Sequence, residues 1–504
     1  MSNTFMNGLK ENLNYDLTEN GAITYKSTMS AVYDMFAFGG AYRKRSDQDC
    51  EELFRAAFKE DSELAAKCLF YLRDCRGGQG ERRFFRVAFK ELAWLDPDFA
   101  YQLLEKIPEY GRWDDLIYAA DGTVLWHDAM MLVARQLNLD LKSKTPSLLA
   151  KWMPSENASS LETKKMAASI RKSLQLTHKQ YRKMLSVLRK RINIVERLMS
   201  EGRWDEIEFD KIPSKAGLIY KNAFARRDII ARKYEEFAKS ADTTVNADTL
   251  YPYEIVAKAL KNYSPWSGRG MKMSETDRAM LQKYWDNQID YLNGEPASMM
   301  CVVDTSGSMT GREASAPINV AISLGIYCAE RMTGPFAGHY ISFASRPQLI
   351  KVEGRDIVDK CYNIAKTNLV DDTNLEAVFN LMLNTALTSK PEDVPKTVVI
   401  ISDMEINQAT NMGWYVDAET SMAKVMSAME TIKAKWTAAG IPCPKLVYWN
   451  VRAGHNNILD RGPDVSFVSG CSPVIFEQVI KGVSGYDLML DKLNSERYAS
   501  ITRG

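Results

Sequence analysis

Two short apolar runs in the C-terminal half of the chain each lead into an aspartate. Residues 299–303 are followed by Asp304, and residues 398–402 are followed by Asp403. Short apolar runs rich in β-branched residues are typical of buried parallel strands. Ligands of such sheets bind just beyond the carboxyl ends of the strands. We therefore expect the two carboxylates to lie side by side at one edge of a sheet.

Hydroxyl side chains accompany these two aspartates. The first aspartate opens an Asp-x-Ser-x-Ser pattern over residues 304–308, and Thr373 lies between the two apolar runs. Carboxylates and hydroxyls are hard oxygen ligands that suit Mg²⁺, with Mn²⁺ as a substitute. We predict a metal site completed by water or by a partner's carboxylate. Its predicted ligands are Asp304, Ser306, Ser308, Thr373 and Asp403. The alternative interpretation is a helix-capping aspartate followed by turn residues.

Strands and helices alternate through this part of the chain. Apolar runs predict strands at 298–303, 338–343, 397–402, 444–450 and 465–468. Alternation with helices predicts an α/β domain with a doubly wound, mainly parallel, Rossmann-like sheet. We expect this domain to occupy residues 298–500, after a linker at 286–297.

The preceding part of the chain has a helical pattern throughout. From residue 21 to 285, apolar residues recur at three- and four-residue spacing, and no run is typical of a strand. The segment 111–116 (Gly-Arg-Trp-Asp-Asp-Leu) is echoed at 202–207 (Gly-Arg-Trp-Asp-Glu-Ile), which favours stacked helical pairs. We predict an all-α, HEAT-like helical repeat domain here. Residues 1–20 are polar and are expected to be flexible.

Length and composition limit the class of protein. A chain of 504 residues exceeds the roughly 250–300 residues of one hydrophobic core, so at least two domains are expected. No apolar run reaches the ~18–20 residues of a membrane span, and the N-terminus lacks the pattern of a signal peptide. The eight cysteines form no CxxC pair. This usage indicates reduced thiols and a cytoplasmic protein.

The net charge of +1 conceals a strongly basic block. Residues 141–240 contain 23 Lys and Arg against 11 Asp and Glu, a local balance of +12. Within the block, Thr177 and Gln180 form a capping-box pattern, after which apolar residues fall on one helix face as far as Met199. Cations project from the opposite face and its flanks, where they can bind phosphates without reading sequence. The predicted RNA-binding residues are Lys179, Arg182, Lys183, Arg189, Lys190 and Arg197. The alternative is a solvated face that only keeps the protein soluble.

The sequence predicts a binding protein rather than an enzyme. The four histidines, His127, His178, His339 and His455, lie outside HExxH and Cys-His patterns. Residues 77–80 resemble a phosphate loop but lack its Gly-Lys-Ser/Thr ending. The paired aspartates would be held by the metal, which makes them poor free acid–base groups. Metal-dependent phosphoryl hydrolysis is the alternative, although it usually needs a second metal or a positioned base.

These motifs resemble known families. The Asp-x-Ser-x-Ser pattern, the later Thr373 and the strand-ending Asp403 resemble the metal-ion-dependent adhesion site of von Willebrand factor A domains. A helical domain followed by such a domain resembles the Ro autoantigen family, in which a TROVE module precedes a von Willebrand A domain. A closer resemblance is to an uncharacterised group of Ro-like proteins with the same domain order. It is carried by residues 72–82, 108–116, 251–256 and 401–405.

The resemblance spans residues 20–495 and implies a function. In Ro-like proteins a helical ring binds structured RNA on its outside and threads single-stranded RNA ends through a basic hole. The resemblance implies that this chain is an RNA-binding component of a ribonucleoprotein. It also implies that the metal-site domain docks a protein partner that offers an acidic side chain. Arg76, Arg82 and Arg83 either line a groove or fix helix packing. The alternative function is a protein-only adaptor or assembly component that acts through the metal site.

Overall fold

The chain divides into two compact units, each made of two separate stretches of sequence. The computed structural model describes residues 14–17, 23–192, 194–247, 249–261, 273–294, 297–311, 313–344, 346–367, 374–405, 428–452, 454, 458, 464–479 and 484–503. The sheet unit comprises residues 1–45 and 250–495, and the helical unit comprises residues 46–249 and 496–504. These bounds depart from the predicted domains at 21–285 and 298–500. The N-terminal stretch belongs with the C-terminal half, and the last residues belong with the N-terminal half.

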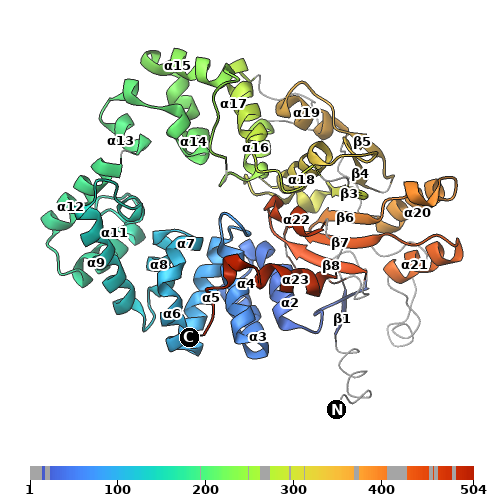
Figure 1. Cartoon of the computed structure of the whole chain (residues 1–504), viewed down its shortest axis with the longest axis horizontal. Coiled ribbons are helices and arrows are strands. Elements are labelled where there is room, and N and C mark those ends of the chain that lie inside the picture. Colours follow the sequence, from blue (N-terminus) through green and yellow to red (C-terminus); the bar gives the residue numbers. More distant parts are fainter. Residues whose placement is uncertain are drawn as a thin grey trace. The chain divides into compact units, whose positions relative to one another are not determined.

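The sheet unit contains a six-stranded sheet in the order β5-β4-β3-β6-β7-β8 (Figure 1). Its five parallel strands are β3 (Met299–Asp304), β4 (His339–Phe343), β6 (Thr397–Ser402), β7 (Lys445–Asn450) and β8 (Val465–Ser469). All five lie within one residue of the predicted strands, so the mainly parallel sheet is confirmed. The edge strand β5 (Leu349–Lys351) pairs antiparallel with β4 and is absent from the prediction.

Helices cover both faces of this sheet. α18 (Pro317–Arg331) packs against β3 and β6, and a side chain at Gly325 would collide with Val303. α20 (Leu375–Ala386) packs against β4, and its residues line a cavity together with Met300. Met300 and Val303 alternate along β3, so the two helices lie on opposite faces. The doubly wound arrangement is therefore present.

Two helices that precede residue 286 belong to the sheet unit. α16 (Pro252–Ala259) and α17 (Glu275–Asp286) pack against α19 (Ile357–Thr367), and α16 also packs against α18. The guanidinium of Arg278 in α17 donates to both carboxylate oxygens of Asp356, at 2.8 and 2.7 Å. These contacts explain why the unit begins at residue 250, well before the predicted linker. The unit also contains α21 (Ala428–Ala438), α22 (Phe476–Val479) and α23 (Gly485–Leu493).

The N-terminal stretch completes the sheet unit. β1 (Tyr15–Leu17) and β2 (Ile23–Tyr25) form an antiparallel pair. β1 lies inside the segment predicted to be flexible, and β2 lies inside the stretch predicted to be all-α, where the prediction that no strand occurs is therefore wrong. α2 (Ala31–Phe38) packs against β8. The hydroxyl of Tyr33 in α2 accepts a hydrogen bond from the backbone N–H of Phe467 at 2.8 Å. Residues at the start of the chain therefore cover the last strand of the sheet.

The helical unit is built from helices and turns throughout its described residues, which confirms the all-α prediction for this stretch. Its α-helices are α3 (Asp47–Glu60), α4 (Ser62–Arg73), α5 (Arg82–Leu95), α6 (Pro97–Leu103), α7 (Ile107–Tyr110), α8 (Trp113–Ala120), α9 (Trp126–Lys142), α10 (Leu149–Trp152), α11 (Leu161–Ser173), α12 (His178–Ile192), α13 (Val195–Ser200), α14 (Ser214–Ala225) and α15 (Asp228–Lys239). Aromatic residues hold α4, α5 and α7 together: the Phe70 ring meets Phe85 and Tyr110 edge to face, with centroids 5.4 and 5.3 Å apart. Within the described parts of both units, every helix is too short or too polar to cross a membrane.

A buried ion cluster lies at the start of α8, in the first of the two echoed segments. Asp115 is fully buried and accepts hydrogen bonds from Arg73 Nε and Arg86 Nε, each at 2.8 Å. The backbone N–H of Arg112 donates to the same carboxylate at 3.0 Å. The cluster therefore joins α4, α5 and α8. The echoed segment at 202–207 carries the same residue types at the surface.

Candidate functional site

The structure brings two of the predicted metal-binding residues together at the carboxyl edge of the sheet. β3 and β6 are parallel neighbours, and Val303 lies opposite Ile401 in their register. Asp304 and Asp403 therefore leave the sheet next to each other. Their exposed fractions are 0% and 4%, so both carboxylates are buried. Two acidic groups in this setting are electrostatically costly unless a cation or protons compensate them.

Hydrogen bonds from the following loop and from β6 hold Asp304. Its Oδ1 accepts from the backbone N–H of Ser306 at 2.8 Å, and its Oδ2 accepts from the Ser402 hydroxyl at 2.5 Å. The hydroxyls of Ser306 and Ser308 lie 3.1 Å apart. Asp304, Ser306 and Ser308 thus form one cluster of oxygen atoms. The remaining predicted ligand, Thr373, lies outside the described residues.

The backbone turns sharply after β6. Met404 has a φ of +64°, in the left-handed region that non-glycine residues rarely adopt. Its N–H donates to the Ser402 hydroxyl at 3.0 Å, and the N–H of Glu405 donates to Asp403 Oδ1 at 3.3 Å. Strained backbone of this kind occurs preferentially at functional sites. The turn places two buried carboxylates, Asp403 and Glu405, in one short loop.

The charge balance of this edge fits a divalent cation. Burial, and secondarily the charge of Asp403, raise the pKa of Asp304 to about 7. Its described partners are the backbone and side chain of Ser306 and the Ser402 hydroxyl, and none of them is cationic. A Mg²⁺ ion would supply the missing positive charge, with the two aspartates and the serine hydroxyls as hard oxygen donors. The described residues hold no group of three or more Asp, Glu, His or Cys suited to a metal, so hydroxyls and water would have to complete the shell.

Two other residues at this edge are missing from the predicted site. Ser402 fixes the orientation of Asp304, and its place next to Asp403 at the end of an apolar run is a signal for it. Arg452 follows β7, and its Nη1 donates to the backbone carbonyl of Ser308 at 3.1 Å. Arg452 and Ser308 are 144 positions apart in sequence. Only the parallel order of the strands brings them together, and no local pattern marks Arg452.

The predicted basic row lies largely on α12. Tyr181, Leu185 and Leu188 are buried, as their spacing predicts. The cations Lys179, Arg182, Lys183 and Lys190 are exposed. Three further exposed lysines, absent from the predicted set, lie on the preceding helix α11: Lys164, Lys165 and Lys172. In the described part of the chain these six lysines form no ion pair. We call the lysines of α11 and α12, together with Arg182, the basic face.

Three of the six predicted RNA contacts have structural partners, although Arg182 donates only to the carbonyl of His178 in its own helix, at 3.3 Å, and stays exposed. The guanidinium of Arg189 donates to the backbone carbonyls of Ala150 and Met153 at 2.8 and 2.7 Å, and so caps the end of α10. Arg197 lies in α13 and pairs with Glu201 directly after that helix. The single helix predicted through Met199 is interrupted after α12. Lys179, Arg182, Lys183 and Lys190 of the predicted set therefore belong to the basic face, and Arg189 and Arg197 do not. Arg189 and Arg197 serve chiefly to hold their own surroundings.

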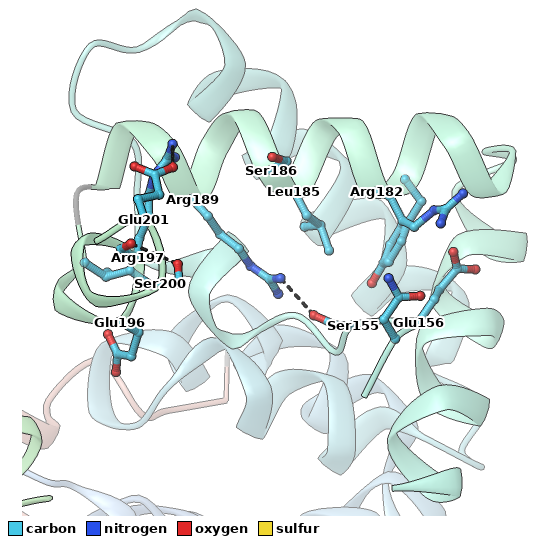
Figure 2. A pocket seen from close by; sticks show the side chains of 13 residues that line it. Ser155, Glu156, Arg182, Leu185, Ser186, Arg189, Glu196, Arg197, Ser200 and Glu201 are labelled. Atoms are coloured by element: carbon cyan, nitrogen blue, oxygen red, sulfur yellow. Dashed lines mark hydrogen bonds and ion pairs between the residues drawn. The ribbon is translucent and has the colours of Figure 1, made fainter. Parts of the chain in front are cut away.

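A cavity of about 460 Å³ lies beside α12 and contains both signs of charge. Figure 2 shows Arg189 reaching across it to the hydroxyl of Ser155, a hydrogen bond of 2.8 Å. Its charged lining residues are Arg182, Arg189, Arg197, Glu156, Glu196 and Glu201. Glu156 pairs with Arg171 at 3.0 Å, and Glu201 pairs with Arg197. Because its three arginines are balanced by three glutamates, the cavity is a poorer phosphate site than the basic face.

Three arginines, Arg76, Arg82 and Arg83, flank the Gly-rich turn at residues 77–80. The structure distinguishes those that fix helix packing from one that could line a groove. Arg76 donates to the backbone carbonyl of Glu109 at 2.9 Å, and Arg83 pairs with Asp47. Both side chains therefore fix helix packing. Arg82 is exposed and has no ion pair in the part of the chain that the structure describes. It is the one of the three that remains available to an external anion.

Comparison with solved structures identifies the class of fold. The crystal structure of the Deinococcus radiodurans RO (RSR) protein matches with a TM-score of 0.50 at 14% sequence identity. The match covers 90% of this chain and 100% of that chain. A helical unit and a mixed α/β sheet unit of this kind form a Ro-like fold, as the sequence resemblance implies.

Sequence comparison shows the family. The chain belongs to the family described as Domain of unknown function (DUF2828), which matches residues 18–108 and 117–297. A second description, Domain of unknown function (DUF7788), matches residues 298–490. The chain is also similar to Uncharacterized protein L728 of Acanthamoeba polyphaga mimivirus, with 30% identity over 490 residues. That match covers 88% of this chain and 80% of the relative.

Proposed function

We propose that this chain is a Ro-like RNA-binding protein whose helical unit binds structured or single-stranded RNA through the basic face. The observation that carries the proposal is the set of six exposed lysines on α11 and α12, within residues 163–195, where the sequence contains no Asp or Glu. Lysines that are not paired with carboxylates retain their full attraction for a polyanion. The Ro-like fold supports the same assignment.

Contacts between lysines and phosphates determine how RNA affinity depends on salt and on RNA sequence. Each lysine that neutralises a phosphate releases condensed counterions, so affinity depends steeply on salt. Phosphate contacts position the nucleic acid but carry little sequence information. We therefore expect this surface to bind RNAs of different sequence with similar affinity.

For the sheet unit we propose a von Willebrand A domain with a metal-ion-dependent adhesion site. Mg²⁺ would be held by Asp304, Ser306, Ser308, Thr373 and Asp403, some of them through water. A bound ion would supply positive charge that could attract an acidic side chain from a protein partner. Arg452 beside the Ser308 loop would favour the same negative group. Because both aspartates would be engaged by the ion, we propose a docking point rather than a reaction centre.

Charge reversal on α12 tests RNA binding directly. The triple variant Lys179→Glu, Lys183→Glu, Lys190→Glu should weaken RNA affinity at least ~100-fold at low salt, because three phosphate contacts are replaced by repulsion. Filter binding with an unstructured RNA and a hairpin RNA measures the effect, and both should weaken alike. These side chains face away from the buried residues of α12, so thermal stability should change little.

A matched control carries the same change in net charge outside the basic block. Lys59→Glu, Lys90→Glu, Lys106→Glu alters three lysines in the other part of the helical unit. We expect it to lower RNA affinity only slightly. Equal losses in the two triple variants would indicate a non-specific effect of net charge, and the assignment to α12 would then be wrong.

The second candidate function is a protein-only adaptor. It is favoured by the cluster of Asp304, Asp403 and the serine hydroxyls, which needs no RNA for its proposed role. Asp403→Ala should abolish Mg²⁺-dependent capture of a partner while it leaves RNA affinity nearly unchanged. Loss of both activities in this variant would contradict separate functions. A parent protein with no salt-sensitive RNA binding would favour the adaptor.

A further inference from the structure

The last residues of the chain are an integral part of the helical unit. Residues 496–498 form a 3₁₀ turn, and Tyr498 and Ile501 are fully buried. The family description that covers the C-terminal half ends at residue 490. The segment 496–503 therefore lies beyond both matched regions, yet it packs with residues from the beginning of the helical unit.

Asp74 is the polar anchor for this segment. It follows α4 and is fully buried. The guanidinium of Arg497 binds both of its carboxylate oxygens, with an Nη2–Oδ1 distance of 2.8 Å. The Tyr498 hydroxyl lies 3.1 Å from Asp74 Oδ2 and 3.3 Å from the carbonyl oxygen of Gly77. A bidentate guanidinium and a hydroxyl thus converge on one buried carboxylate, which is a geometrically specific arrangement.

Aromatic contacts surround the same anchor. The Tyr498 ring stacks on Tyr110, with centroids 5.7 Å apart and planes at 21°. It meets Tyr71 edge to face, with centroids 6.1 Å apart and planes at 88°. The Tyr110 hydroxyl donates to the backbone carbonyl of Arg497 at 2.5 Å. The segment is therefore held through its backbone, a charged side chain and a buried ring.

The Gly-rich turn after α4 is shaped to admit the segment. A Cβ atom on Gly77 would lie 3.0 Å from Cδ of Arg497, and one on Gly78 would lie 1.9 Å from the carbonyl oxygen of Tyr71. Glycine is therefore required at position 78, where a side chain would collide with the backbone, and a side chain at position 77 would crowd Arg497. The turn that superficially resembles a phosphate loop thus has an occupant within the chain itself.

We propose that Tyr71, Asp74, Gly77 and Tyr110 form a peptide-binding site for the chain's own C-terminal segment, residues 496–503. The helical unit is complete only when this site is filled. Without the segment, the buried Asp74 carboxylate loses its cation and the ring of Tyr110 loses its stacking partner. Removing one partner of a buried ion pair is strongly destabilising. The site should also bind the segment when it is supplied as a separate peptide.

Truncation and complementation test this inference. Deletion of residues 496–504 should lower the melting temperature by at least ~6 °C. Hydrogen exchange should accelerate in residues 71–82 and 107–111 and stay unchanged in β6. A synthetic peptide of residues 494–504 should bind the truncated chain saturably and restore both properties, and the same peptide with Tyr498→Ala should not. An unchanged melting temperature, or a peptide without effect, would overturn the proposal.

Point variants of the full chain provide a second arm if the truncated chain fails to fold. Arg497→Gln removes the cation that faces Asp74, whereas Glu496→Gln changes an exposed neighbour. Exchange in residues 71–82 should accelerate at least ~10-fold in the first variant, as expected for the loss of ~1.4 kcal/mol of local stability. The second variant should match the parent. Equal exchange in the two variants would contradict the proposed site.

Discussion

Asp304→Asn is expected to stabilise the metal-free protein and to remove its response to Mg²⁺. The pKa of Asp304 is raised to about 7, so its carboxyl group binds a proton more tightly in the folded than in the unfolded chain. The stability this provides is present at low pH and is lost as the pH rises towards 7. At pH 8 the charged, buried carboxylate costs up to roughly 4 kcal/mol, which the neutral asparagine avoids.

Thermal unfolding with and without Mg²⁺ measures both effects. Without metal, the parent should be more stable at pH 6 than at pH 8, and Asp304→Asn should raise the melting temperature at pH 8. With Mg²⁺ the parent should gain stability, and the variant should not. Asp393→Asn, at an exposed position of the same unit, is the control and should behave like the parent. A Mg²⁺ response that persists in Asp304→Asn would contradict the proposed metal site.

Asp115→Ala is expected to destabilise the helical unit by about 3–5 kcal/mol. The substitution leaves Arg73 and Arg86 without the buried carboxylate that both contact, at the junction of α4, α5 and α8. Unpaired buried charge is among the most destabilising changes in proteins. Urea denaturation monitored by circular dichroism measures the effect, which should appear as a lower midpoint.

The internal echo supplies a matched control for this variant. Glu206 is the counterpart of Asp115 in the second copy, and it pairs with Arg203 at the surface. Exposed ion pairs contribute ~0–1 kcal/mol, so Glu206→Ala should have little effect. Similar losses of stability in the two variants would show that burial of the first cluster does not determine how much it stabilises the helical unit.

The central strands β3, β6 and β7 could be predicted because each is a short, mainly apolar run, and burial on both faces of a parallel sheet requires that composition. β5 is different. It has only three residues, follows Pro347 closely, and carries the exposed Leu349 and Lys351 on either side of Ile350. An edge strand of this length has no sequence pattern of its own, since it is formed by pairing with β4.

The site residues likewise divide into those that a local sequence pattern marks and those that only the tertiary structure explains. Asp304 and Asp403 are marked by their place at strand ends, and Lys179 and Lys183 by helical spacing. Arg189 lies at the flank of the predicted face, and only the position of the 150–155 segment decides that it caps α10. The association of residues 496–503 with Asp74 also depends on tertiary structure, because no local pattern links positions so distant in sequence.

The central claim, RNA binding through the basic face, is tested most directly by the salt dependence of RNA affinity. Fluorescence anisotropy of a labelled single-stranded RNA should be recorded between about 50 and 200 mM salt for the parent and for the Lys179→Glu, Lys183→Glu, Lys190→Glu variant. For the parent we predict a log–log slope of roughly −0.7 for each neutralised phosphate, and for the variant a slope shallower by about 2. A parent affinity that does not change with salt, or an identical slope in the variant, would contradict the assignment of RNA binding to these lysines.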